Sequence, residues 1–214
     1  MFFMDVIVLS NPLSVHLLSI LRDEKTGTKE FRRTLAALSS IIFIKSSEDI
    51  DTEVIKVKTP FEYAMCAQLS EKIVFVPILR AGLAMLANIL EIFPDAIVEH
   101  LGIYRDEKTL KPEPYYSSLD DKVENSVVFI LDPMLATGGT ISYAVEKIAQ
   151  YKPARIKILS VVAAPEGIER VSKTVDKMDI DVKLCVSAID RTLNQNGYII
   201  PGLGDAGDRA FGTQ

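Results

Sequence analysis

The chain reads VVFILDPMLATGGT from Val127 to Thr140, and this stretch decides the fold. Five consecutive apolar residues, closed by Asp132 and Pro133, predict a buried strand that ends abruptly. Beyond the loop, apolar residues recur at the i, i+3, i+4, i+7 and i+8 spacing of one face of an amphipathic helix, namely Ile141, Ala144, Val145, Ile148 and Ala149. The stretch therefore predicts a strand, a glycine-rich loop and a helix.

The glycine-rich loop suits a phosphate group. The first turn of a helix offers unpaired backbone N–H groups and the positive end of the macrodipole, and glycines let the backbone approach an anion closely. Thr137 and Thr140 add hydroxyl donors. The loop is neither a Walker A site, because no Lys-Ser or Lys-Thr pair follows the glycines, nor a G-x-G-x-x-G loop.

Asp132, at the end of the strand, adds a carboxylate that could hold sugar hydroxyls while the loop amides hold a phosphate. This combination favours a sugar phosphate as ligand. Taken alone, the stretch leaves open an ordinary strand-to-helix turn made tight by small residues.

The composition is that of a globular protein. At 214 residues, with 48% hydrophobic and 25% charged residues, the chain is expected to form one large domain with an appended substructure. A net charge of −5 and an isoelectric point near 5.2 argue against nucleic acid or an anionic membrane as the main partner.

The compartment is predicted from cysteines and hydropathy. Cys66 and Cys185 lack metal-ligand spacing, and their apolar surroundings predict inert buried thiols in a reducing compartment. The sequence begins without a basic region and contains no apolar run of about 18 residues, so neither a signal peptide nor a membrane span is predicted. We therefore expect a cytoplasmic protein.

Strand-like and helix-like segments alternate from residue 54 onward. We expect strands at 54–57, 73–79, 97–104, 127–131, 156–163 and 182–188, and helices at 61–71, 82–93, 139–151 and 166–171. Before them we expect a short strand or arm at 6–9 and helices at 13–22 and 28–44. Such alternation predicts a parallel sheet covered on both faces, with ligands at the carboxyl ends of the strands.

Two arginines follow predicted strands, where such ligands bind. Arg80 comes after the strand at 73–79, and Arg105 comes after the strand at 97–104. A guanidinium group keeps its charge and can hold phosphate oxygens bidentately. Taken singly, each arginine would more often be a surface ion-pair partner, and their shared location at strand ends favours the phosphate role.

Four stretches together resemble the uracil phosphoribosyltransferase family of the type I phosphoribosyltransferases. They are PILRAG at 77–82, YRDE at 104–107, DPMLATGGT at 132–140 and GYIIPGLGDAGDRAFGT at 197–213. Most of the superfamily has two adjacent acids where this chain has Asp132-Pro133, and the proline is typical of the uracil branch. The resemblance begins at LRDEKTGTKEFR (21–32), includes VKTPF (57–61), and is weakest between Thr59 and Lys72.

The resemblance implies the fold, the domain organisation and the reaction. It implies an α/β fold with an open, mainly parallel five-stranded sheet and helices on both faces. One domain is expected over 1–214, with a core at about 54–188 and a small hood formed by 1–50 and 189–214. The implied reaction joins uracil to 5-phosphoribosyl 1-pyrophosphate (PRPP), gives UMP and pyrophosphate, and uses Mg²⁺ on the pyrophosphate with no certain protein ligand.

The resemblance also assigns residues. Asp132, Arg105 and Asp205 are the implied catalytic residues, and uracil is bound by Ile199, Gly204, Asp205 and Ala206. PRPP is bound by Arg80, Arg105, Asp132, Pro133, Met134, Leu135, Ala136, Thr137, Gly138, Gly139, Thr140 and Asp205. The segment from Asp106 to Leu119, which has no apolar period, is expected to be a lid over the site, with a plain surface loop as the alternative.

Two rival functions and several partners stay open. One rival is a phosphoribosyltransferase for another base, and the other is a noncatalytic regulator that binds nucleotide or RNA, which the acidic charge disfavours. The family implies a homodimer or homotetramer and leaves a GTP activator open. A basic cluster favours a solvated face, with subunit contact or effector binding as alternatives, and consists of Lys25, Lys29, Arg32 and Arg33. His16 could be a base but is expected to be structural.

Overall fold

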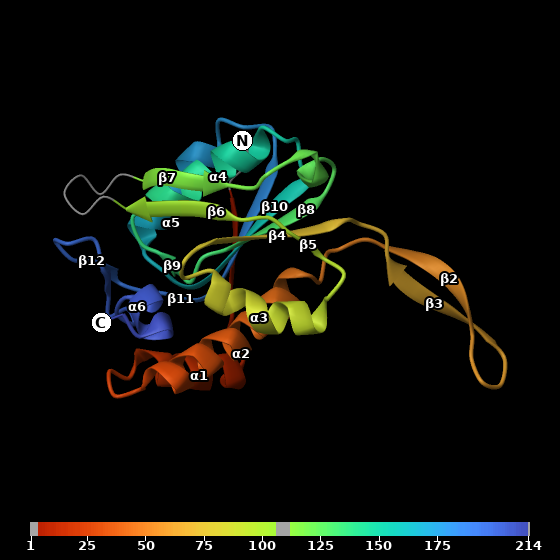
Figure 1. Cartoon of the computed structure of the whole chain (residues 1–214), viewed down its shortest axis with the longest axis horizontal. Coiled ribbons are helices and arrows are strands. Elements are labelled where there is room, and N and C mark those ends of the chain that lie inside the picture. Colours follow the sequence, from red (N-terminus) through yellow and green to blue (C-terminus); the bar gives the residue numbers. More distant parts are fainter. Residues whose placement is uncertain (1–3, 106–111, 214) are drawn as a thin grey trace.

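A mixed sheet forms the centre of the molecule, in a computed structural model that describes residues 4–105 and 112–213. Its strand order is β1-β11-β10-β8-β4-β6-β7, and every neighbouring pair is parallel except β6 with β7 (Figure 1). The strands are β1 (Asp5–Val8), β11 (Asp181–Ile189), β10 (Arg155–Ala163), β8 (Val127–Leu131), β4 (Ile73–Leu79), β6 (Leu101–Arg105) and β7 (Pro112–Ser117), with β5 (Ile97–Val98) on β4 and β9 (Met134–Leu135) on β10. The predicted α/β class with a mainly parallel sheet is confirmed, but the predicted five strands are too few, because the described residues place nine strands in this sheet.

Both faces of the sheet are buried because successive side chains of each strand point to opposite sides. Phe75 and Phe129 pack on one face with Phe43, with ring centroids 5.2–5.6 Å apart, whereas Val76 and Ile130 pack on the other. The first face is covered by α1 (Pro12–Arg22), α2 (Thr28–Ser46) and α3 (Leu83–Ile92), and the second by α4 (Gly139–Ala149) and α5 (Pro165–Val175). The strands with continuous runs of Val, Ile and Leu are therefore covered by helices on both faces of the sheet, as predicted.

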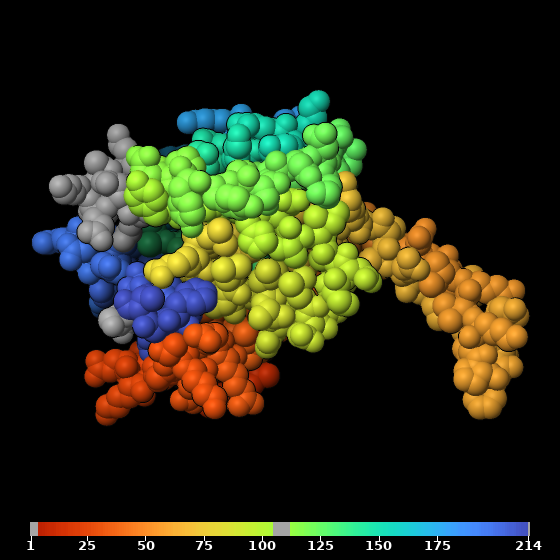
Figure 2. Space-filling view, in the orientation of Figure 1, coloured from red at the N-terminus to blue at the C-terminus, as the bar shows by residue number. Residues whose placement is uncertain are grey.

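The helix predicted at 61–71 is wrong. Residues Tyr63–Leu69 form β3, which pairs antiparallel with β2 (Thr52–Lys58) in a separate two-stranded hairpin. Figures 1 and 2 show this hairpin projecting away from the body of the molecule. The sequence of β3 also fits a period of two, and cross-strand pairing decides between the two periods. The strand expected at 54–57 exists, but it lies outside the central sheet.

The segment from Asp106 to Leu119 is more ordered than predicted where it is described. Residues Pro112–Ser117 form β7, which pairs antiparallel with β6 at the edge of the sheet. An edge strand tolerates prolines because the N–H groups on its outer side donate no hydrogen bond to a neighbouring strand. The rest of the expected lid, residues 106–111, lies outside the described residues.

The C-terminal helix α6 (Ala206–Phe211) packs beside α2 below the sheet in Figure 1, whereas the N mark lies at the top of the molecule. The remaining elements are a 3-10 turn at Asp121–Val123 and a two-stranded ribbon of β12 (Thr192–Leu193) and β13 (Ile199–Ile200).

Cys185 is buried, and burial raises the pKa of its thiol to about 11. The prediction that Cys66 is buried is wrong, because this residue is exposed on β3. Over the described ranges, no helix is long and apolar enough to span a bilayer.

Candidate active site

A cavity of about 210 Å³ lies at the carboxyl ends of the parallel strands. Three segments form its wall: the loop between β8 and α4, the residue after Arg80, and the C-terminal tail. The lining residues are Ala81, Asp132, Met134, Leu135, Ala136, Thr137, Gly138, Gly139, Thr140, Ile141, Gly197, Tyr198, Ile199, Gly204, Asp205, Ala206 and Gly207. The fold thus brings the predicted phosphate loop and the predicted base-binding tail to one cavity.

The phosphate loop requires glycine at the start of α4. Gly138 has a φ of +73°, and a Cβ atom there would lie 2.6 Å from the carbonyl oxygen of Gly167 in α5. Gly138 is therefore needed both for its backbone conformation and for close packing against the next helix. Thr137 and Thr140 also line the cavity. A helix N-terminus, small residues and two hydroxyls at a cavity wall form the setting that a phosphate monoester prefers.

Asp132 stands at the strand end, where Pro133 stops β8. The Oδ1 atom of Asp132 accepts a hydrogen bond of 3.2 Å from the backbone N–H of Met134. Desolvation raises the pKa of the Asp132 carboxyl to about 6, and the Met134 hydrogen bond opposes that shift only in part. At neutral pH this carboxylate is ionised, turned into the cavity and short of donors. It is suited to accept hydrogen bonds from vicinal hydroxyls of a sugar.

The opposite wall is built from the tail. Asp205 caps α6 through a 2.9 Å hydrogen bond from the Asp208 N–H to its Oδ1 atom, and the Asp205 side chain also lines the cavity. Gly204 has a φ of +81°, which exposes its backbone at the wall without a side chain in the way. Ile199 and Ala206 are almost fully buried beside it. This wall therefore presents backbone polar groups among apolar side chains.

Comparison with known proteins identifies the family of the chain. A family model described as "Uracil phosphoribosyltransferase" matches residues 8–213. The chain belongs to the uracil phosphoribosyltransferase family. Uracil phosphoribosyltransferases from Clostridium beijerinckii and Symbiobacterium thermophilum are each 44% identical to it over 210 residues, covering 98% of this chain and 99% of each relative.

Solved structures show where the same fold occurs. The AQ2163 protein from Aquifex aeolicus is 41% identical, with a TM-score of 0.90 over 96% of this chain and 97% of that one. A hypoxanthine phosphoribosyltransferase from Staphylococcus aureus, 15% identical, reaches a TM-score of 0.50 over 76% of each chain, which is a likeness of fold alone.

Not every predicted site residue lines the cavity. Pro133 is buried behind the loop, where its carbonyl oxygen accepts hydrogen bonds from Val161 and Val162 at 3.0 and 3.2 Å. Arg80 is exposed beside the cavity, with its Nη2 atom 3.5 Å from the Asp208 carboxylate. Arg105 ends β6, and its side chain lies outside the described part of the structure. The pyrophosphate role of the two arginines stays a prediction.

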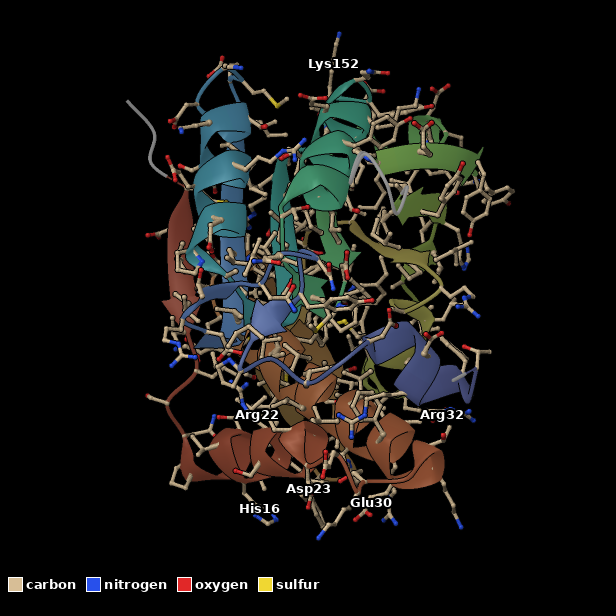
Figure 3. All side chains as sticks on the ribbon, turned by 90° about the vertical axis from the view of Figure 1, so that its left-hand side faces the viewer. His16, Arg22, Asp23, Glu30, Arg32 and Lys152 are labelled. Atoms are coloured by element: carbon tan, nitrogen blue, oxygen red, sulfur yellow. The ribbon has the colours of Figure 1, made fainter. Side chains whose placement is uncertain are left out.

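The sequence analysis also missed some lining residues. Ala81, Ile141, Gly197, Tyr198 and Gly207 are each adjacent to a predicted position or part of a quoted motif, so the motifs themselves were the available signal. His16 is exposed on the outer side of α1, away from the residues that line the cavity (Figure 3). Two other omissions, Arg22 and Asp190, lie behind the tail and have no motif signal.

Proposed function

We propose that this protein transfers the phosphoribosyl group of PRPP to uracil, with UMP and pyrophosphate as products. One observation carries the proposal: a single cavity joins the glycine-rich start of α4, the Asp132 carboxylate and the Ile199 to Ala206 wall. These three parts match the phosphate, the ribose and the base of UMP in order. Family membership supports the same reaction.

The chain's task in this reaction is positioning. Displacement of pyrophosphate at the anomeric carbon passes through a state with positive charge on the sugar, so aligned reactants and a neutralised leaving group lower the barrier. Asp132 holds the ribose hydroxyls, and Met134 to Thr140 hold the 5′-phosphate. Arg80 and Arg105 hold the pyrophosphate, while Asp205 serves both PRPP and uracil. The backbone between Ile199 and Ala206 reads the base.

We include Mg²⁺ in the proposal, carried mainly by the substrate. Among the described residues, no group of three or more His, Cys, Asp or Glu side chains could form a metal site by itself. The cavity does supply two carboxylates, Asp132 and Asp205. Mg²⁺ accepts such a setting, because it usually binds through one or two carboxylates plus substrate phosphates. When bound, the ion would neutralise charge on the pyrophosphate.

One assay tests the function. UMP formation from uracil and PRPP with Mg²⁺ is measured by chromatography, and uracil is then replaced by cytosine, hypoxanthine and orotate. Uracil alone should give product at a high rate. A better rate with another base would establish the rival transferase. No product with any base, together with RNA binding at physiological salt, would establish the regulator instead, although a net charge of −5 is poorly suited to RNA.

Homo-oligomerisation is part of the proposal, with the hairpin as its basis. Val54, Phe61 and Met65 on the hairpin have 73%, 97% and 69% of their surface exposed. A lone two-stranded hairpin is marginally stable in water, and a second copy of the chain would cover these apolar side chains. Light scattering should give at least a dimer for the wild type. Phe61→Ser combined with Met65→Ser should shift the protein toward monomer.

A GTP activator and a cytoplasmic location complete the proposal. Lys25, Lys29, Arg32 and Arg33 are exposed near the α1–α2 corner, as the solvated-face alternative requires, and Lys29 and Arg33 line a hollow there that could take an anion. The measurement is the rate of UMP formation with and without GTP, in the wild type and in Lys29→Ala with Arg33→Ala. Stimulation that these changes remove would support effector binding. An unchanged rate would leave the cluster as a solvated face.

A further inference from the structure

The C-terminal tail is attached to the rest of the molecule largely through arginine side chains. Arg22 ends α1 and binds the tail, while Arg209 belongs to the tail and binds the α1–α2 corner. Figure 3 shows Arg22 and Arg32 where the two N-terminal helices meet the C-terminal segment. Arg32 donates from Nε to the carbonyl oxygen of Ala210 at 2.8 Å. These contacts join residues that are more than 160 positions apart.

The tightest of these attachments is a triad of Arg22, Asp190 and Gly202. The Arg22 guanidinium donates to both carboxylate oxygens of Asp190, at 2.8 and 2.5 Å, in the bidentate geometry typical of strong ion pairs. Arg22 Nη1 also donates to the Gly202 carbonyl oxygen at 2.7 Å, and the Gly202 N–H donates to Asp190 Oδ2 at 2.8 Å. Both polar groups of Gly202 are therefore held by one ion pair.

Gly202 lies between residues of the base wall, which is the side of the cavity formed by the tail from Ile199 to Ala206. Ile199 precedes it by three positions and Gly204 follows it by two, and both line the cavity. The φ of Gly202 is +62°, and a Cβ atom there would lie 2.2 Å from the carbonyl oxygen of Ile199. The chain thus reverses sharply at Gly202. A shift of this residue would move Ile199 and Gly204 with it.

The ion pair is anchored to the sheet and largely withdrawn from water. Asp190 follows directly after β11, and its N–H donates to the carbonyl oxygen of Ala163 in β10 at 2.8 Å. The side chains of Asp190 and Arg22 expose 5% and 24% of their surfaces. Buried ion pairs add little net stability because desolvation offsets their attraction, but they hold groups in a defined geometry.

From this arrangement we propose that Arg22 and Asp190 are positioning residues that set the place of the uracil-reading backbone without touching the substrate. The inference rests on the proposed transfer to uracil. It assigns to the triad the alignment of Ile199 and Gly204 relative to the phosphate loop. Since misplacement of a reactant by about 1 Å can cost about a hundredfold in rate, a small displacement of this wall would impair use of uracil. PRPP, held mainly by the sheet-borne loop, would be bound as before.

The simpler alternative is that the triad only stabilises the fold, and the chain offers a matched control. Arg155 and Glu71 form a second partly buried ion pair, with 17% and 19% of their side-chain surfaces exposed. This pair lies at the opposite end of the sheet, because Arg155 begins β10 and Glu71 precedes β4. Glu71→Gln and Asp190→Asn make the same chemical change, a carboxylate to an amide, in the two pairs.

The experiment compares both variants and Arg22→Lys with the wild type. For each, KM and kcat for uracil are measured at saturating PRPP, PRPP affinity is measured by titration calorimetry without uracil, and Tm is recorded. Asp190→Asn should raise KM for uracil at least about tenfold and leave PRPP affinity within about twofold. Arg22→Lys keeps the charge but loses the bidentate contact, so its KM for uracil should lie between those of the wild type and Asp190→Asn. Glu71→Gln should lower Tm without changing KM.

The outcomes separate the proposal from its alternatives. If Asp190→Asn loses uracil and PRPP binding equally, or if its KM stays at the wild-type value, the positioning role is wrong. An equal rise of KM in Glu71→Gln would assign the effect to general stability. A second measurement uses Arg22→Ala with millimolar guanidinium, which should lower KM for uracil in this variant and not in the wild type. If the wild type forms no UMP from uracil, the proposed function itself has failed.

Discussion

The two walls of the cavity are built in different ways. The phosphate wall is a continuous stretch, Asp132 to Ile141, whose ends are a central strand and a helix packed on the sheet. The base wall is a tail with only one short helix, held by contacts such as Arg22 to Gly202 and Arg209 to Leu21, which span 180 and 188 positions. One wall is a local structure, and the other depends on distant parts of the chain.

Arg209 illustrates how much the base wall depends on those distant parts. Its Nη1 atom donates to the carbonyl oxygens of Leu21 and Leu203 at 2.5 and 2.6 Å, and its Nη2 atom donates to that of Asp23 at 2.6 Å. The guanidinium also lies 4.3 Å from the ring centroid of Phe31, close enough for a cation–π interaction. The position of the tail therefore depends on the corner between α1 and α2, which Arg209 contacts.

The largest expected effect belongs to the phosphate wall. Asp132→Asn should lower kcat/KM by about a hundredfold to ten-thousandfold, because two charge-assisted hydrogen bonds to ribose hydroxyls, each contributing about 1.5–3 kcal/mol, would be lost. Steady-state kinetics with uracil and PRPP measures the change, and circular dichroism checks that the fold is kept. A variant with near-wild-type kcat/KM would remove Asp132 from the site.

The second prediction tests the base wall alone. Gly204→Val should abolish use of uracil, a loss of at least about a hundredfold, yet spare PRPP binding. Valine is strained at the φ of +81°, and its Cβ would lie 3.2 Å from Arg209 Cδ. Gly138→Ala is the matched change in the other wall and should lose PRPP binding first. If both variants lose the same ligand, the walls do not divide the substrates as proposed.

The third prediction concerns Arg80 and Arg105, the two arginines that follow β4 and end β6. Arg80→Ala and Arg105→Ala should each weaken PRPP and pyrophosphate about tenfold or more, and UMP far less, because UMP lacks the leaving group. Binding titrations with the three ligands measure the differences. An equal loss for UMP would assign these arginines to the phosphate monoester or to the fold.

The last prediction concerns stability rather than substrate binding. Because burial raises the pKa of Asp132 to about 6, the folded state holds this proton more tightly than the unfolded state does. The resulting stabilisation is complete below pH 3.8 and is lost as the pH rises through about 6, which amounts to about 3 kcal/mol at most. Asp132→Asn has no such loss. Between pH 4 and pH 7 the free energy of unfolding of the variant should therefore rise relative to that of the wild type, as urea titrations can measure. A difference between the two proteins that stays constant over this pH range would contradict the raised pKa of Asp132.

Sequence reasoning worked where the signal was local and periodic. The strand and helix on either side of Asp132 to Thr140 were predicted within a residue or two, because an unbroken apolar run, a proline and a 3.6-residue period all agree there. It failed at 61–71, where the apolar residues fit two periods and the pairing of β2 with β3 chose between them. It also missed the strand at 112–117, because prolines mask an edge strand.

The amino-acid sequence by itself determined the phosphate loop, the strands and helices on either side of it, and the family, because these depend on residues close together in the chain. Only the tertiary structure decided that Arg22 and Asp190 meet at Gly202. Nothing in the local pattern marks an arginine at a helix end or an aspartate after a strand as partners 168 positions apart. The physical reason is that a bidentate ion pair needs two side chains within about 3 Å, and that proximity exists only once the sheet and helices have packed.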